Sequence, residues 1–111
     1  MDYEVFLDGT SARLVLLTNS VLNFSLFFTA IDTSNGETKY WKVNGAIKNV
    51  AGTVVMLSQT VEEVYNDAGM SLASLTLVED DINNALGIYF TGIADKTIRV
   101  GGHFRLHDLR F

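Results

Sequence analysis

Apolar and polar residues alternate most regularly near the C-terminal end of the chain, over residues 97–107. One face of this segment carries Ile98, Val100, Phe104 and Leu106 with Gly102 in phase, and the other carries Arg99, His103, Arg105 and His107. A period of two is that of a β-strand with one face on a core. The segment is therefore predicted to be a strand, and Gly101-Gly102 in its middle predicts a bulge or a close backbone approach.

A second clean alternation covers residues 38–48, where apolar and polar side chains again separate. Trp41, Val43 and Ile47 share a face with Gly45, whereas Tyr40, Lys42, Asn44 and Lys48 share the opposite one. Weaker patterns predict further strands at residues 13–17, 21–31, 52–57, 60–65, 70–78 and 85–91. Residues 60–67 are equally compatible with a short helical turn.

Turn-forming residues separate these segments at positions 34–36, 49–52, 66–69, 80–84 and 92–96. Several short strands with regular turns are typical of an all-β fold, an antiparallel, jelly-roll-like β-sandwich of about seven to eight strands. The 111 residues fit one such domain spanning 1–111. The chain has no proline, so its edge strands lack a usual guard against pairing with other chains.

The amino-acid composition argues against several classes of function. The chain has no cysteine, which excludes disulfides and thiolate chemistry. Its net charge of −5 argues against nucleic acid as a partner, because phosphate binding needs a basic field. The acidic start does not resemble a signal peptide. The apolar stretch 14–31 is interrupted by Asn19, Ser20, Asn23 and Ser25, so no membrane span is expected.

The apolar content predicts association. Hydrophobic residues make up 48% of the chain, whereas a domain of this size buries only about two-thirds of its unfolded surface. We therefore expect some apolar surface to be covered by a partner, although scattered apolar surface is also normal in monomers.

Charge is distributed unevenly along the chain. Residues 49–95 contain seven acids and no Lys or Arg, whereas Lys96 and the residues after it contain four bases against one acid. Patches of opposite sign would set the register between subunits. The alternative is that both are simply solvated, and surface ion pairs contribute only about 0–1 kcal/mol each.

Four stretches in order along the chain carry a resemblance to a known family. They are residues 6–16 (FLDGTSARLVL), residues 38–47 with their aromatic pair, the acidic-Asn turn and strand of residues 80–92, and residues 94–99 (ADKTIR). Together they resemble a module of bacteriophage virion structural proteins, often the C-terminal part of a longer tail or fibre chain. The sequence departs from that family at Met70 and Val100, where tryptophan is common.

The resemblance implies a non-enzymatic, β-rich virion component that is made in the host cytoplasm and forms a homotrimer. Its partners would be its own copies and major capsid or tail proteins. The start at Met1 without a long extension favours a capsid decoration (cement) protein that stabilises the head. The alternative is a tail- or fibre-associated module that binds a receptor or glycan for host adsorption.

Candidate chemical sites are few. His103 and His107 would have Cα atoms roughly 13 Å apart on one strand, too far to share a metal within one chain. Residues 79–84 are rich in carboxylates and amides, but such residues favour turns without any ion. Ser11 and Ser20 have no evident histidine partner. We therefore expect no enzyme activity, no cofactor and no metal site.

The same patterns predict residues of an interaction surface. Tyr40 lies on the face opposite Trp41, which makes it a candidate contact residue. The polar face of the last strand and the apolar C-terminal end supply the rest. The predicted interface residues are Tyr40, Tyr89, Arg99, His103, Arg105, His107, Leu109 and Phe111.

Overall fold

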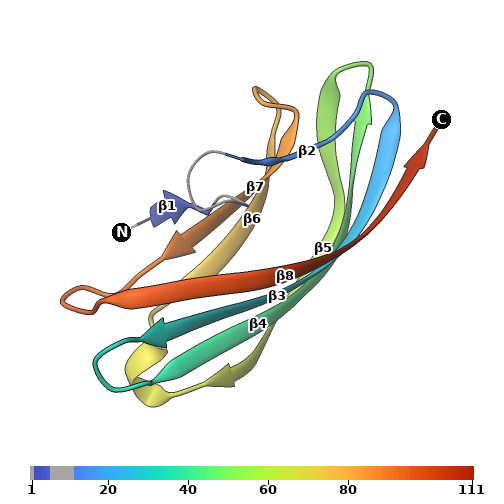
Figure 1. Cartoon of the computed structure of the whole chain (residues 1–111). Coiled ribbons are helices and arrows are strands. Elements are labelled where there is room, and N and C mark those ends of the chain that lie inside the picture. Colours follow the sequence, from blue (N-terminus) through green and yellow to red (C-terminus); the bar gives the residue numbers. More distant parts are fainter. Residues whose placement is uncertain (1, 6–11) are drawn as a thin grey trace.

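The computed structural model describes residues 2–5 and 12–111. Eight strands and one short 3-10 helix make up this part of the chain. The strands are β1 (Asp2–Glu4), β2 (Leu14–Val15), β3 (Ser20–Asp32), β4 (Thr38–Val50), β5 (Thr53–Asn66), β6 (Ser74–Asp80), β7 (Ala85–Thr91) and β8 (Ile98–Arg110). The helix η1 (Ala68–Met70) lies between β5 and β6. The strands form two antiparallel sheets packed face to face, which confirms the predicted sandwich (Figure 1).

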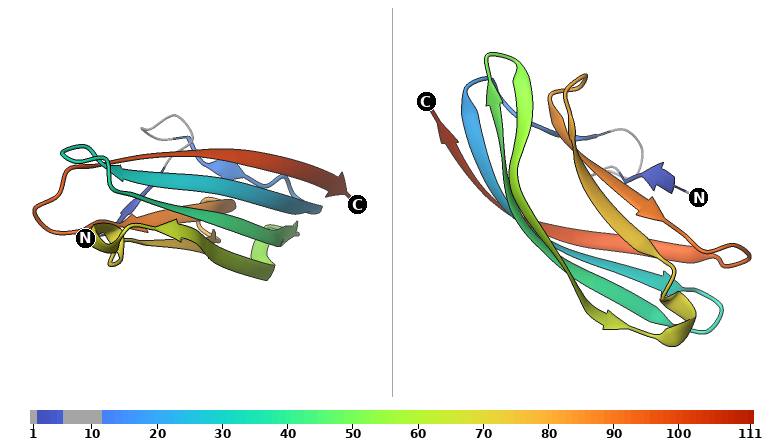
Figure 2. Two further views of the ribbon diagram at one scale, coloured as in Figure 1. Left: turned by 90° about the horizontal axis from the view of Figure 1, so that it is seen from below. Right: turned by 180° about the vertical axis from the view of Figure 1, so that it is seen from behind.

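The two sheets differ in size. The large sheet has the order β5-β4-β3-β8 and is built from strands of 13 or 14 residues. The small sheet centres on β7, with β6 along one edge and β1 and β2 sharing the other. Because β8 returns to lie beside β3, the large sheet has a Greek-key arrangement. Figure 2 shows the large sheet twisting and bending over the small one.

The hydrophobic core lies between the sheets and follows the predicted alternation. Every second side chain of β3 is buried, and Trp41, Val43 and Ile47 of β4 are fully buried beside it. Phe28 is near the centre, with its ring centroid 5.9 Å from Trp41 and 6.0 Å from Phe90 of the small sheet. The inward apolar residues of the last strand pack against this core up to Phe104.

The glycine pair of β8 lies in a regular ladder, and the irregular ladder is that of β4 and β5. A Cβ at Gly102 would lie 3.1 Å from the Phe27 carbonyl oxygen, so the expected close backbone approach is present. The expected bulge is absent, because β8 pairs with β3 without any register shift. The shifts occur instead in the β4–β5 ladder, where Leu57 and Val64 are the extra residues on β5.

Other element boundaries also differ from the prediction. The two segments predicted at 52–57 and 60–65 form one continuous strand, β5. The segment predicted at 70–78 begins four residues later, because η1 and a turn precede β6. The short strand β1 was not predicted, since three residues carry no readable alternation.

A buried lysine joins β4 to the segment before β6. Lys39 is only 1% exposed, and its Nζ donates to the carbonyl oxygens of Ser71 at 3.0 Å and Ala73 at 2.8 Å. The same Nζ forms an ion pair with Glu63 Oε1 at 3.0 Å. A buried charge is tolerated where it is paired and hydrogen-bonded in this way.

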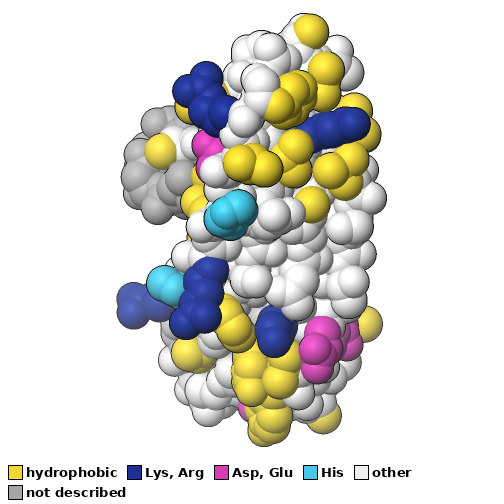
Figure 3. All heavy atoms as spheres, turned by 90° about the vertical axis from the view of Figure 1, so that its right-hand side faces the viewer, with side chains coloured by type: hydrophobic (Ala, Val, Ile, Leu, Met, Phe, Trp, Pro, Cys, Tyr) yellow, Lys and Arg dark blue, Asp and Glu magenta, His cyan; other side chains and the backbone are white. Residues whose placement is uncertain are grey.

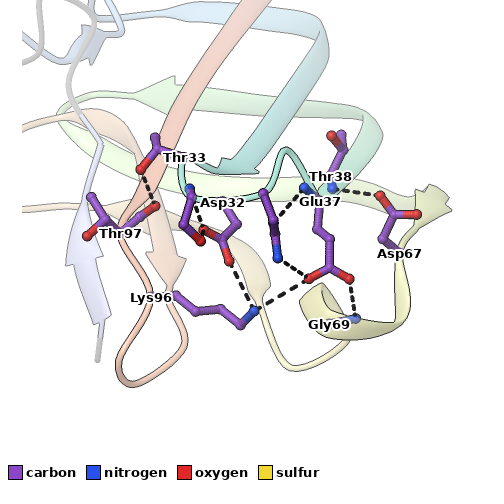
Figure 4. A network of polar contacts seen from close by, with 10 residues as sticks. Asp32, Thr33, Glu37, Thr38, Asp67, Gly69, Lys96 and Thr97 are labelled. Atoms are coloured by element: carbon purple, nitrogen blue, oxygen red, sulfur yellow. Dashed lines mark hydrogen bonds and ion pairs between the residues drawn. The ribbon is translucent and has the colours of Figure 1, made fainter.

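A polar network closes one end of the sandwich (Figure 4). The Asp32 carboxylate accepts hydrogen bonds from the Ser34 hydroxyl and amide, and Lys96 Nζ lies 3.1 Å from its Oδ2. Lys96 also lies 3.6 Å from Glu37, which accepts from the Gly69 amide. The Ser34 hydroxyl bond is the main cause that lowers the pKa of Asp32, and the bond to Asp32 raises the pKa of Lys96. The network thereby ties the β3–β4 turn to the β7–β8 loop and to η1.

The molecule is flat and elongated. Its principal extents are 48 × 24 × 18 Å and its radius of gyration is 14.7 Å. A compact chain of this length has a radius of gyration of about 13 Å. The long strands of the large sheet account for the difference, because they extend past the small sheet that covers them.

Candidate functional site

The outward face of the large sheet is formed by four long strands, and its residues form rows across them. His103, Phe27, Lys42 and Glu62 make one row, and Gly101, Thr29, Tyr40 and Tyr65 make the next. Figure 3 views the molecule from this side and shows hydrophobic side chains gathered towards both ends, with a polar band between them. The rows through Asn23, Ser25 and Asn44 supply that polar band.

Two exposed tyrosines stack on this face. The ring centroids of Tyr40 and Tyr65 are 6.3 Å apart with an interplanar angle of 21°. The Tyr65 hydroxyl donates to Asp67 Oδ1 at 2.6 Å, and this bond is the main cause that lowers the pKa of Asp67 and raises that of Tyr65. Because Asp67 also accepts from the Thr38 amide, the stacked pair is held rigidly at the end of β5.

A shallow hollow of about 430 Å³ lies beside the tyrosines, over the paired glycines of β8. Gly101 has no atom within 4 Å of the position where a Cβ would stand, so the hollow is formed by the missing side chain. It is lined by Phe27, Thr29, Ile31, Arg99, Val100, Gly101, Gly102 and His103.

Both edges of the large sheet consist of long strands. In the part of the chain that the structure describes, β5 pairs only with β4, and β8 pairs only with β3. The beginning of the β5 edge is closed by carboxylates: the Val54 amide donates to Asp81 Oδ1 at 2.8 Å and the Met56 amide to Glu79 Oε2 at 2.6 Å. From Leu57 onward, every residue of β5 is exposed.

The inner face of the large sheet is incompletely covered near these edges. Val61 of β5 and Leu106 of β8 point to the same side as the core, yet they are 41% and 48% exposed. The small sheet is too narrow to reach them. Two apolar side chains of the core layer are therefore left open to solvent, one at each edge.

The predicted interface residues divide between two surfaces. Six lie together on the outward face of the large sheet: Tyr40, Arg99, His103, Arg105, His107 and Leu109. Phe111 directly follows β8, and its amide donates to the Asn19 carbonyl oxygen at 2.9 Å. Tyr89 lies instead on the outward face of the small sheet, where burial is the main cause that raises its pKa.

The sequence did not identify the residues whose exposure depends on how the strands pair and on how far the opposite sheet extends. Val61 belongs to the core layer but stays exposed, which depends on the width of the opposite sheet. Phe27 and Ile31 show the alternation that predicts outward positions, and a count of apolar residues on the outward face of β3 would have identified them.

The acidic segment after β6 is a turn. Asp80 accepts from the amide and the side-chain nitrogen of Asn83, which is the main reason its pKa is lowered. Asn84 has a positive φ of 52°, as Asn tolerates in turns. Glu79 and Asp81 bind β5 amides instead of facing a common centre.

Among residues 2–5 and 12–111, no group of three or more His, Cys, Asp or Glu side chains is placed to hold a metal ion. All buried side-chain nitrogen and oxygen atoms in this part of the chain have hydrogen-bond partners. Within the same residues, no helix has the length and apolar character needed to cross a membrane.

No protein-family model, curated protein or solved structure matches this chain.

Proposed function

We propose that this chain is a non-enzymatic structural component of a bacteriophage virion, most simply a capsid decoration protein that assembles as a homotrimer. The single observation that carries the proposal is the exposed apolar surface of the large sheet. Leu109 and Phe111 at the end of β8 are 63% and 68% exposed, and Phe27 and Val55 on the same outward face are 41% and 40% exposed. Apolar surface gathered in this way marks an interaction site.

Two further observations support the proposal. Met70 is fully buried and Val100 packs against the core, so the two positions where the resembling family has tryptophan are both packing positions here. The hollows on the large sheet are shallow, and the carboxylates of residues 79–81 bind backbone or side-chain groups of the chain itself. These features suit a protein that acts through broad contacts.

The proposal is tested first on the particle. Virions purified from cells that carry this gene are analysed by mass spectrometry and by gold-labelled antibody. The chain should be present in many copies per particle and on the outside of the head. Particles that lack the chain would contradict the proposal.

The second test compares three variants in light scattering. Leu109→Ser with Phe111→Ser should weaken self-association by about 100-fold or more, because two large apolar side chains lose their burial. Glu62→Ala should change it by less than about fivefold, since an exposed ion pair contributes little. Ile82→Ser is the matched control, because Ile82 is 94% exposed on the β6–β7 turn and away from the large sheet. An equal effect at Ile82 would contradict the assignment of the surface.

A second candidate function is glycan binding during host adsorption. It is favoured by the stacked Tyr40–Tyr65 pair, which lies beside a mostly apolar hollow with Arg99 and His103 in its lining. Binding on a glycan array should be lost in Tyr40→Ala and retained in Tyr89→Ala, because Tyr89 lies on the other sheet. An array without any signal would exclude this candidate.

A further inference from the structure

We infer that copies of this chain join edge to edge, with β8 of one copy pairing antiparallel with the exposed part of β5 of the next. The inference rests on the proposed function, because it names the surface through which the chain assembles. The partner is a second copy of this chain, and the contact is head-to-tail between two different edges.

The strand directions permit this arrangement. The four strands of the large sheet are antiparallel in the order β5-β4-β3-β8, so its two edge strands run in opposite directions. When copies are related by rotation about an axis along the strands, β8 of one meets β5 of the next in antiparallel orientation. The sheet then continues across the contact with the same pattern, and no copy has to be turned over.

The charges of the two edges are complementary. β5 contains Glu62 and Glu63 and no Lys or Arg, whereas β8 contains three Arg, two His and one Asp. Pairing two β8 edges about a two-fold axis would instead bring the arginine-bearing face of β8, with Arg99 and Arg105, against the same face of the other copy. Like charges opposite each other across strands are destabilising, so charge favours the head-to-tail contact.

The apolar positions select a register. Between the bulges at Leu57 and Val64, residues 58–63 form a regular segment of β5. Pairing this segment with residues 104–109 of the next copy places Val61 opposite Leu106, the two exposed side chains of the core layer. The same register places Arg105 opposite Glu62 on the outward face. A shift by two residues one way would set Val61 against Asp108, which leaves a carboxylate beside an apolar side chain. A shift the other way would set Leu106 against Gln59, which leaves the more exposed apolar side chain beside a polar one.

The register is tested by disulfide trapping, for which the absence of native cysteine gives a clean background. Within one chain, positions 62 and 105 are separated by three strand spacings, about 14 Å, so they cannot be bridged intramolecularly. Under mild oxidation the variant Glu62→Cys with Arg105→Cys should form covalent dimers and larger species. The off-register pair Glu62→Cys with Gly101→Cys and the small-sheet control Thr76→Cys should remain monomeric on a denaturing gel, and a Cβ at Gly101 meets nothing within 4 Å.

Each single cysteine variant distinguishes the head-to-tail contact from a two-fold contact. Efficient dimers of Arg105→Cys alone would show that β8 pairs with itself, and would overturn the inference. An oligomer seen by light scattering that the Glu62–Arg105 cysteine pair does not trap would also overturn it, while the proposed function would stand. A chain that stays monomeric and is absent from virions would remove both.

Exchanging the charges of Glu62 and Arg105 tests the proposed pairing independently. Glu62→Arg and Arg105→Glu should each weaken association by about tenfold, and the chain that carries both changes should regain it. Urea unfolding of each variant shows whether the monomer still folds, since Glu62 also lies opposite Lys42 within its own sheet. Loss of association in the doubly exchanged chain with an intact fold would contradict the pairing.

Discussion

Strands β3 and β5 belong to the same sheet and are nearly equal in length, yet they are buried very differently. β3 buries seven of its 13 side chains, whereas β5 buries only Val54 among its 14. Both strands carry apolar residues on the face towards the core. The difference arises because the small sheet lies over the centre of the large one and reaches only the beginning of β5, where Glu79 and Asp81 bind its amides. Alternation in a sequence therefore shows which way a side chain points, and the opposite layer decides whether it is covered.

The largest expected effect of this contrast is on folding stability. Phe28→Ala, in the centre of β3, should lower the free energy of unfolding by about 3–5 kcal/mol, because it leaves a cavity between Trp41 and Phe90. Val61→Ala, in the exposed part of β5, should cost less than about 1 kcal/mol in the dilute monomer. Urea unfolding at low protein concentration measures both values. Equal losses would show that the edge is as well packed as the centre.

A smaller difference in stability is expected between alanine substitutions at two glycines, Gly45 of β4 and Gly101 of β8. A Cβ at Gly45 would stand 2.6 Å from the Ser58 carbonyl oxygen and 2.7 Å from Phe24 Cζ, so Gly45→Ala should cost about 1–3 kcal/mol through overpacking. Gly101→Ala, in β8, meets nothing within 4 Å and should leave the unfolding midpoint nearly unchanged. If the Gly101 variant were the more destabilised of the two, the assignment of an open hollow over Gly101 would be wrong.

The smallest effect concerns pH at the end of the sandwich, where Asp32 ends β3 and Asp67 follows β5. Hydrogen bonds lower the pKa of both carboxyls below their unfolded value of about 3.9. The unfolded chain therefore binds more protons than the folded chain at acidic pH. The contribution of these carboxyls to stability is complete above the unfolded pKa and is lost as the pH drops through the folded pKa values. Urea midpoints between pH 6 and pH 2 should show this loss.

Two aspartate variants show which carboxyl group causes the loss of stability at low pH. Asp32→Asn should flatten the acid side of the stability profile, because Asp32 is held by Ser34 and Lys96. Asp95→Asn, at an exposed position of the β7–β8 loop, should leave the profile unchanged. An unchanged slope in Asp32→Asn would mean that the network in Figure 4 does not contribute to acid stability.

Much of the fold could be predicted from the sequence, because the central strands have clear alternation. The faces of residues 38–48 and 97–107 are confirmed residue by residue, including Trp41 inward and Arg99 outward. That the two predicted segments form the single strand β5 could not be predicted. The polar residues Ser58 and Gln59 look like the end of a strand as long as the neighbouring strand is unknown. The sheet that carries Tyr89 could not be predicted for the same reason: alternation gives a face, but not the sheet to which the face belongs.

The proposed interaction surface could be predicted only in part. The polar face of β8 was recognised because its alternation is regular. The exposure of Val61 and Leu106 was not, because it depends on how far the opposite sheet reaches. The buried Lys39 was also missed, since a lysine among polar neighbours gives no sign that two carbonyl groups and Glu63 surround it.

The most direct test of the account is hydrogen exchange followed by mass spectrometry at several protein concentrations. If the edges of the large sheet join copies of the chain, amides of residues 57–66 and 101–110 should become protected as the concentration rises, while those of β3 stay protected throughout. Protection at both edges that does not depend on concentration, or new protection confined to the small sheet, would contradict the claim that this protein works by joining its copies through the large sheet.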